Sequence, residues 1–149
     1  METPSDQKTQ KPIIENSNPH KPTTAFIGAS WLAFFAGVVA FIIGLWNAEM
    51  QLNEKGYYFT VLLFGLFAVI SVQKNVRDRQ EEIKVSDLYF GISWASALIA
   101  ISLLIIGLWN AELELSEKGF YAMSFTLSLF SSIAVQKNVR DNQAEEILK

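Results

Sequence analysis

A polar phrase whose residue types could do chemistry occurs twice in this 149-residue chain. It reads GLWNAEMQLNEKGYY over residues 44–58 and GLWNAELELSEKGFY over residues 107–121. Carboxylates, amides and ammonium groups at such fixed spacing could hold an ion or a polar ligand. The same groups also cap helices and pair at a water boundary, which is the explanation we favour. Six residues of the phrases form the candidate periplasmic recognition or packing cluster: Asn47, Ala48, Glu49, Asn110, Ala111 and Glu112.

Residues suited to catalysis are scarce. There is no cysteine, which excludes disulfides, thiolate nucleophiles and cysteine-ligated metals. The single histidine, His20, lies among prolines near the N-terminus, where a solvated side chain is expected rather than a general base. We therefore predict no catalytic residue, no cofactor and no metal site, and a protein that is not an enzyme. The net charge is −3 and the charged residues form no concentrated basic patch, so nucleic acid is not expected as a partner.

Four segments without a charged residue must position the polar phrases. Two of the segments are 22 residues long, and a helix of that length spans about 33 Å, which matches a hydrocarbon core of about 30 Å. The other two segments are 16 residues long and need helical extension at their ends to cross that core. The segments are residues 25–46, 57–72, 88–109 and 120–135.

The alternative to a membrane protein is a soluble protein with a buried helical hairpin. Half of the residues are hydrophobic, and they surround each expected helix instead of forming one stripe. A chain this short has too few polar residues to cover four such helices. The sequence therefore predicts an all-α integral membrane protein with four transmembrane helices, in contact with the lipid bilayer.

The chain is an internal duplication. Residues 24–86 (repeat 1) align with residues 87–149 (repeat 2) at a constant offset of 63, and 28 of the 63 pairs are identical. Residues 1–23 hold all four prolines and many polar residues, which is typical of a disordered tail. Identity is concentrated in the repeated phrase and in VQKNVRD, residues 72–78 and 135–141. Lipid-facing positions need only be apolar, whereas helix ends accept fewer sequences.

The duplication and the charges predict a topology. Each repeat has two spans, so both repeats enter and leave on one side, as duplicated parallel helical hairpins about an axis along the membrane normal. Ten lysines and arginines lie in the tail, the central linker and the C-terminus, against two in the turns, Lys55 and Lys118. The positive-inside rule then places both termini in the cytoplasm.

Cap signals predict the helix ends. Thr23 and Ser86 precede the first helix of each repeat, which should end near Ala48 or Ala111. Asn53 and Ser116 are the predicted N-caps of the second helices. Leucines just before these caps and aromatic residues four positions after them have the spacing of a hydrophobic staple.

The helix ends also hold residues suited to the membrane interface. Tryptophan rings favour that boundary, and long basic side chains can place their charges among lipid phosphates. These predicted anchors are Trp31, Trp46, Trp94, Trp109, Lys74, Arg77, Lys137 and Arg140. Two rows of small residues could allow close helix packing, namely Ala36, Ala40 and Gly44, and Ser124, Ser128 and Ser132.

Transport is the alternative function. The apolar segments contain no ionisable residue other than tyrosine, so the usual proton or ion relay is missing. A pore lined by hydroxyl groups stays open as an alternative. Its candidates are concentrated in repeat 2, unlike a symmetric pore: Ser93, Ser96, Ser102, Ser124, Ser128, Ser131 and Ser132.

The two polar phrases and VQKNVRD resemble the YiaA/YiaB family of bacterial inner membrane proteins. The resemblance covers about residues 24–142 and includes two copies of the family's two-helix unit, as in its two-domain type. It implies a multi-pass inner membrane protein and carries over no catalytic or ligand residue. We expect an interaction or accessory protein of the cell envelope, with a homo-oligomer or other inner membrane proteins as partners, and a small-solute channel or transport component as the alternative.

Overall fold

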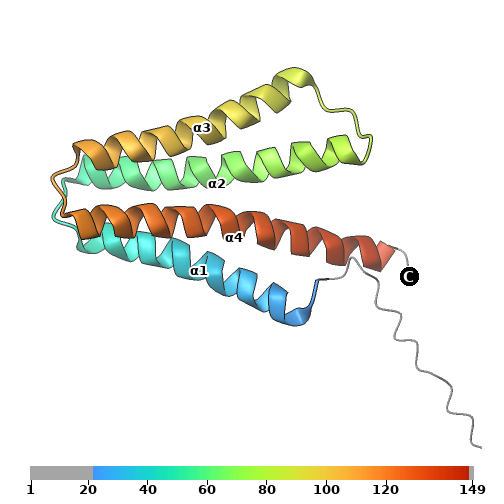
Figure 1. Cartoon of the computed structure of the whole chain (residues 1–149), viewed down its shortest axis with the longest axis horizontal. Coiled ribbons are helices and arrows are strands. Elements are labelled where there is room, and N and C mark those ends of the chain that lie inside the picture. Colours follow the sequence, from blue (N-terminus) through green and yellow to red (C-terminus); the bar gives the residue numbers. More distant parts are fainter. Residues whose placement is uncertain (1–21, 148–149) are drawn as a thin grey trace, which may run out of the picture.

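The computed structural model describes residues 22–147, with side chains described for residues 22–143. Its helices are α1 (Thr24–Asn47), α2 (Leu52–Gln80), α3 (Asp87–Asn110) and α4 (Leu115–Ile147). Most of the predicted tail, including His20, lies outside the described residues. Figure 1 shows the four helices lying side by side, with both short connections at one end of the molecule.

The predicted caps of the first helices are confirmed. Thr23 Oγ1 accepts from the backbone nitrogen of Phe26 at 3.2 Å, and Ser86 Oγ accepts from that of Tyr89 at 3.2 Å. Both residues have extended backbone, and both helices end at the asparagine before an alanine, as expected. Repeated cap chemistry therefore gives α1 and α3 the same length.

The predicted caps of the second helices are wrong by two residues. α2 begins at Leu52, and its N-cap is Gln51, whose backbone nitrogen donates to Glu54 Oε2 at 2.9 Å. In α4 the backbone nitrogen of Glu114 donates to Glu117 Oε2 at the same distance. Each glutamate reaches back three residues to satisfy a donor at the helix start, as in a capping box. That bond starts the helix before Asn53 or Ser116.

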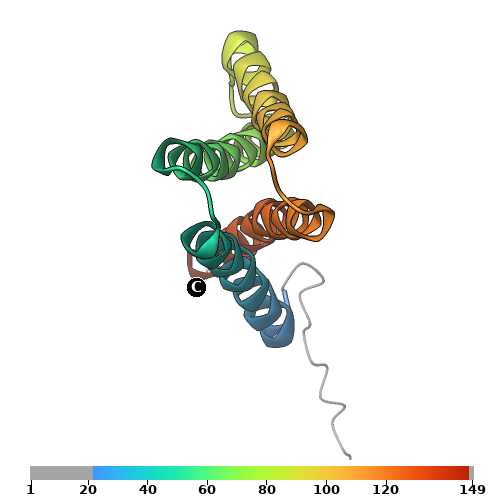
Figure 2. The same ribbon diagram turned by 90° about the vertical axis from the view of Figure 1, so that its left-hand side faces the viewer.

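The helices pack across the repeats. α1 lies along α4 and α2 lies along α3, whereas the two helices of one repeat touch little (Figure 2). α2 and α4 also contact each other at the centre, and α1 and α3 lie at the outside. This differs from the expectation of two hairpins with internally packed helices. The connections, residues 48–51 and 111–114, are short, yet each leads from one helix pair to the other.

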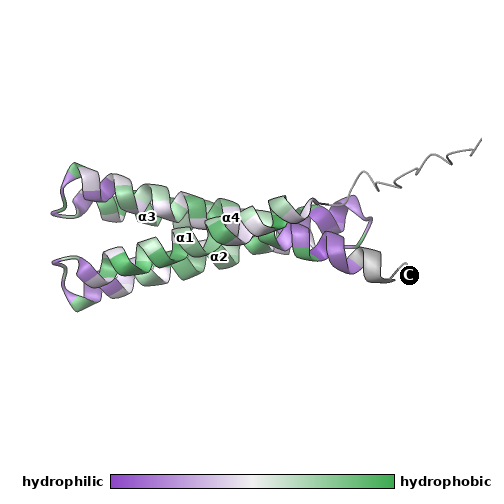
Figure 3. Cartoon of the chain, turned by 90° about the horizontal axis from the view of Figure 1, so that it is seen from below, coloured by the Kyte–Doolittle hydropathy of each residue, from purple (hydrophilic) through white to green (hydrophobic). Residues whose placement is uncertain are grey.

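Hydropathy changes along the molecule. Figure 3 shows an apolar middle with polar residues at the connections and at the opposite ends of α2 and α4. Three helices, α1, α2 and α3, are long and apolar enough to cross a membrane. α4 has buried serines in its apolar part, Ser124, Ser128, Ser131 and Ser132. These serines lower its mean hydropathy although they face the protein interior.

The core is aromatic and lies near the connections. Tyr58 and Tyr121 occupy matched positions and stack on each other, with ring centroids 6.0 Å apart and planes 15° apart. Phe41 meets the Tyr121 ring edge-on at 5.4 Å, and Phe125 lies 6.2 Å from Phe41. All four side chains are buried. The two repeats thus meet at a pair of identical residues.

Glycines allow the close approach of the helices beside this core. A methyl group at Gly44 would lie 2.7 Å from Phe120 Cε1, and one at Gly107 would lie 2.6 Å from Tyr57 Cε1. Real Cβ contacts are essentially never this short. Of the predicted small-residue row in α1, Gly44 is confirmed as a packing residue, whereas Ala36 is exposed. Further along α1, a methyl group at Gly37 would lie 2.7 Å from Ser128 Oγ.

Candidate functional site

The repeated polar phrase terminates α1 and α3. Asn47 Nδ2 donates to the Ile43 carbonyl oxygen at 2.9 Å, and Asn110 Nδ2 donates to the Ile106 carbonyl oxygen at 2.7 Å. The following alanines close the helices, because their backbone N–H groups donate to the carbonyl oxygens of Gly44 and Gly107. Four of the six residues of the candidate cluster therefore have a structural role that explains their repetition.

The remaining two of the six residues, both glutamates, have no such role at a helix end. Glu49 and Glu112 are exposed, and they lie in the two separate connections at the same end of the molecule (Figure 1). Neither makes a hydrogen bond or ion pair with the side chains described. Lys55 instead donates to the Trp46 carbonyl oxygen at 3.1 Å, which ties the start of α2 to the end of α1. The six residues thus form two turns and no common cluster.

The four tryptophans lie on the outer surface. Trp46 and Trp109 are 82% and 83% exposed, at the ends of α1 and α3. Trp31 and Trp94, nearer the other ends, are exposed to a lesser degree. Trp31 stacks on Phe35 with ring centroids 5.7 Å apart. Their exposure at both ends of the apolar region agrees with the anchoring role expected of them, which stays a prediction.

Two hydrogen bonds between buried side chains join the repeats. Asn75 Nδ2 donates to Ser93 Oγ at 2.6 Å between α2 and α3, and Asn138 Nδ2 donates to Ser30 Oγ at 3.1 Å between α4 and α1. These pairs are related by the offset of 63, and all four side chains are buried. None of the four was among the predicted site residues except Ser93, which was a candidate for lining a pore. The signal was available, since an asparagine inside a helix recurs within VQKNVRD.

A cluster of ion pairs joins α2 to α4 at the end opposite the connections. Arg77 lies 3.0 Å from Asp141, and Arg140 lies 3.7 Å from Asp78. These pairs are again related by the offset of 63. Glu81 breaks the symmetry, because it binds both arginines and its matched residue in repeat 2 is alanine.

The lysines of the cluster remain near solvent. Lys74 and Lys137 pair with Asp78 and Asp141 within their own helices, at 2.5 Å and 3.0 Å. Their side chains are 60% and 55% exposed, so they can still reach a lipid headgroup. The arginines are more buried and hold the repeats together. Of the four predicted basic anchors, the lysines have the geometry better suited to that role.

The Asp141 carboxyl lies beyond the apolar segment and has a perturbed pKa. Burial would raise its pKa, but hydrogen bonds and charges from Lys137 and Arg77 outweigh burial and hold the pKa below the ordinary 3.8. The carboxylate is therefore ionised at neutral pH. A cavity of about 10 Å³ lies beside it between matched residues of α2 and α4, large enough for about one water molecule.

The candidate pore serines are mostly engaged with their own helices. Ser124, Ser128 and Ser131 donate to carbonyl oxygens three or four residues earlier in α4, at 2.5–2.8 Å for the shorter contacts. Ser132 donates to the Leu129 carbonyl oxygen at 2.7 Å. Ser102 is exposed on the outside of α3. The buried hydroxyl groups satisfy themselves locally, as serines in packed membrane helices do.

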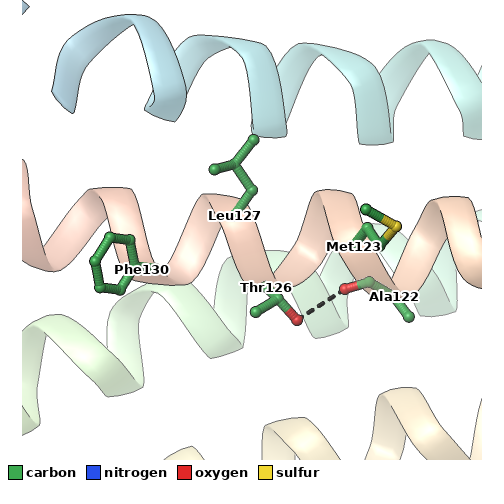
Figure 4. A pocket seen from close by; sticks show the side chains of 5 residues that line it. All are labelled: Ala122, Met123, Thr126, Leu127 and Phe130. Carbon is green, nitrogen blue, oxygen red and sulfur yellow. Dashed lines mark hydrogen bonds between the residues drawn. The ribbon is translucent and has the colours of Figure 1, made fainter. Parts of the chain in front are cut away.

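An apolar groove of about 430 Å³ lies along the outer face of α4 (Figure 4). Its only hydroxyl, on Thr126, donates to the Ala122 carbonyl oxygen at 2.8 Å. The groove therefore offers hydrocarbon contact and no polar recognition. Its lining residues are Ala122, Met123, Thr126, Leu127 and Phe130. No group of three metal-ligating side chains is found within the described part of the chain.

Comparisons with known proteins place these features in a family. The model of the yiaA/B two-helix domain matches residues 26–78 and again residues 89–141. The two matches include both VQKNVRD segments and most of all four helices. No solved structure matches the chain.

Three curated proteins are similar to the chain. The inner membrane protein YiaA of Escherichia coli (strain K12) is 56% identical over 117 residues, 78% of this chain and 81% of that protein. The inner membrane protein YiaB of the same strain is 31% identical over 105 residues, 68% and 87% of the two chains. The uncharacterized membrane protein YubF of Bacillus subtilis (strain 168) is 44% identical over 64 residues, 42% and 74%. The last match has the length of one repeat.

Proposed function

Because the chain belongs to the yiaA/B two-helix domain family and is similar to two proteins named as inner membrane proteins, we propose that it is a four-span inner membrane protein without catalytic activity. In this proposal it acts as an interaction or accessory protein of the cell envelope. One observation supports this most. The interior of the helix bundle is filled by packed side chains, and most of its polar side-chain groups bind one another or carbonyl oxygens of their own helix. The remaining surface is apolar and suited to lipid and other membrane helices.

The fourth span is supported by the location of the serines in α4. Four of them are buried against the protein interior, so the helix presents a more apolar surface outward than its composition indicates. The basic residues Lys74 and Lys137 lie in the C-terminal parts of α2 and α4, and Trp46 and Trp109 lie at the C-terminal ends of α1 and α3, next to the connections. We propose that both termini face the cytoplasm, as the lysine and arginine distribution favours.

A reporter fusion tests this topology. An enzyme that is active only in the periplasm, fused after Gln51, should be active, and the same enzyme fused after Lys84 should be inactive. Gln51 lies in the connection between α1 and α2, and Lys84 lies between α2 and α3. Activity at Lys84 together with inactivity at Gln51 would reverse the topology. Activity at both sites would contradict four spans.

The accessory role predicts a stable partner. Native membranes carrying the tagged full-length chain should be cross-linked, extracted in mild detergent and purified by affinity. A stoichiometric membrane protein should co-purify. Repeated recovery of the chain alone, or only of a homo-oligomer, would contradict an accessory role.

A second test separates this proposal from a channel or transport component. Glu49→Gln combined with Glu112→Gln removes the two exposed carboxylates that occupy matched positions in the connections. If these turns only end helices, the double variant should leave solute uptake by proteoliposomes unchanged. Loss of an uptake that the unaltered chain shows would favour transport. The packed serines of α4 make a hydroxyl-lined pore within one chain the weaker of the two proposals.

A further inference from the structure

The apolar groove on the outer face of α4 can hold a hydrocarbon chain. Met123, Thr126 and Phe130 are exposed along it. The groove extends over residues 122–130, which is about 12 Å of helix. Its only hydroxyl donates to a carbonyl oxygen of α4. An occupant of this groove is therefore held by hydrocarbon contact.

The matched face of repeat 1 has larger side chains. Phe59 and Leu63 of α2 occupy the positions that correspond to Ala122 and Thr126 of the groove. Both of these larger residues are exposed, so they lie on the surface of α2. The duplication therefore shows which residues would fill the groove of α4 on an otherwise similar helix.

Lys137 lies beyond the groove on the same face of α4. It follows Phe130 by seven residues, which is two helical turns and about 10 Å along the helix. Its side chain is half exposed. Along this face an apolar groove is thus followed by a positive charge, which is the order in which a phospholipid presents an acyl chain and a phosphate.

The ammonium group of Lys137 is less fully neutralised than that of its matched lysine. Its partner Asp141 lies 3.0 Å from it and also 3.0 Å from Arg77. Lys74 lies 2.5 Å from Asp78, whose arginine partner is further away at 3.7 Å. An ammonium group has three hydrogen-bond donors. Lys137 uses one of them on a carboxylate that it shares, so it can also donate to a phosphate oxygen.

The small cavity between α2 and α4 lies next to this lysine. Lys137 and Gln136 both line it, and its 10 Å³ suffice for about one hydroxyl group or water molecule. Gln136 Oε1 is buried and has no hydrogen-bond partner in the described part of the chain, so it requires a donor. A headgroup hydroxyl can supply that donor, whereas an ionised phosphate cannot.

The ion-pair cluster around the cavity has one more basic than acidic side chain. This excess favours an anionic headgroup over a zwitterionic one. The basic residues are Lys74, Arg77, Lys137 and Arg140, and the acidic residues are Asp78, Glu81 and Asp141.

We propose that α4 binds an anionic phospholipid with a glycerol headgroup. One acyl chain lies in the groove, the phosphate accepts a hydrogen bond from Lys137, and a headgroup hydroxyl donates to Gln136 Oε1. Basic pockets between membrane helices at the cytoplasmic side bind anionic lipid headgroups. The site rests on the proposed four spans, which put α4 in the bilayer, and it is specific to repeat 2 because Phe59 and Leu63 occupy the matched face of repeat 1.

Lipid affinity of the purified full-length chain tests the site. Native mass spectrometry in detergent measures binding of phosphatidylglycerol, of phosphatidylcholine with the same acyl chains, and of inorganic phosphate. Phosphatidylglycerol should bind about fivefold more tightly than phosphatidylcholine, as expected for one lysine near an anionic headgroup. Inorganic phosphate should not displace it. Equal affinity for the two lipids, or displacement by inorganic phosphate, would overturn the proposal.

A lysine variant tests the headgroup contact. Lys137→Gln should lower the affinity for phosphatidylglycerol about fivefold and leave that for phosphatidylcholine nearly unchanged. The control Lys84→Gln removes the same charge from the exposed connection between α2 and α3, and should change neither affinity. An equal loss in the two variants would show attraction to overall charge and would contradict the site.

The groove is tested by filling it with the residues of repeat 1. Ala122→Phe combined with Thr126→Leu should weaken binding of both lipids and keep the preference for phosphatidylglycerol. Thr126→Leu alone, at an exposed position, should weaken both to a smaller extent and provides the test if the double variant does not unfold cooperatively. The control Leu63→Phe enlarges the matched face of α2 and should change neither affinity.

Unchanged lipid affinity in a cooperatively unfolding filled variant would contradict an acyl chain in the groove. The reporter fusions at Gln51 and Lys84 measure the topology separately. Loss of the lipid site would therefore leave the four spans intact, whereas a failed topology would show in the fusions.

Discussion

Repeat 1 and repeat 2 share the polar residues that form most of the bonds between them, whereas many of their apolar residues differ. The identical residues include both members of the serine–asparagine bonds and of the cross-repeat ion pairs. The apolar residues that differ include matched pairs in the core, such as Phe41 with Leu104. Polar contacts between helices constrain geometry on both sides, whereas apolar packing can be rebalanced between partners. The comparison therefore separates residues that fix the pairing from residues that fill it.

The matched glycines give the largest expected difference between the repeats. Gly107→Ala should destabilise by about 1–3 kcal/mol through overpacking, and more than Gly44→Ala. The added methyl meets Tyr57 at Gly107 and Phe120 at Gly44. The Tyr57 ring is held by a bond from its hydroxyl to the Leu103 carbonyl oxygen at 2.6 Å, so it yields less. Thermal unfolding in one detergent ranks the two variants, and the reverse order would contradict this account.

That tyrosine hydroxyl is a direct way to make the repeats more alike. Tyr57→Phe introduces the residue that repeat 2 has at position 120. It should cost about 0.5–1.5 kcal/mol, because one hydrogen bond is lost and the ring remains. The same measurement on Phe120→Tyr provides the matched comparison. An unchanged unfolding midpoint for Tyr57→Phe would show that this bond does not stabilise the bundle.

The asparagines should have a smaller and unequal effect. Hydrogen bonds between membrane helices average about 0.6 kcal/mol. Asn75→Ala should cost more than Asn138→Ala, since the Asn75 bond is 2.6 Å long and the Asn138 Oδ1 atom is buried without a partner. Ser93→Ala and Ser30→Ala are the partner variants, and double variants measure the coupling. Equal costs would remove the asymmetry claimed for these two bonds.

The ion pairs between α2 and α4 should have the smallest effect at neutral pH. Asp141→Asn should cost about 0.2–1 kcal/mol, and less in high salt. Since the folded pKa of Asp141 lies below its ordinary 3.8, its contribution is complete above that pH and is lost as the pH falls through the folded value. The variant and the unaltered chain should differ in unfolding midpoint at pH 7, and this difference should shrink as the pH falls below 3.8. A constant difference across this range would contradict the assignment.

Local features of the fold were predictable from the sequence. The charge-free segments located the helices, and Thr23 and Ser86 located two of their starts. The cap prediction at Asn53 was wrong because the glutamate that follows it satisfies an earlier backbone donor. Both cap patterns fit the same sequence, and the bond from the Gln51 backbone nitrogen to Glu54 distinguishes them in the structure.

The pairing of helices across the repeats could not be predicted from local pattern. Short connections favour contact between successive helices, yet α1 packs on α4 and α2 on α3. The contacts that join the paired helices, such as Asn75 with Ser93 and Asn138 with Ser30, form only when the helices meet. For the candidate site, the repeated phrase was predicted to end helices, and Asn47 and Asn110 do bind carbonyl oxygens at the ends of their own helices.

The packing of each helix of repeat 1 on a helix of repeat 2 affects how the chain folds during its synthesis. The bond from Asn138 to Ser30 joins residues 108 positions apart. At about 5–20 residues per second, roughly 5–20 seconds of translation separate the two. During that interval α1 is in the membrane without its partner helix, and its buried serine has only its own helix for hydrogen bonding. The unfinished chain therefore carries α1 with the face that later packs against α4 uncovered.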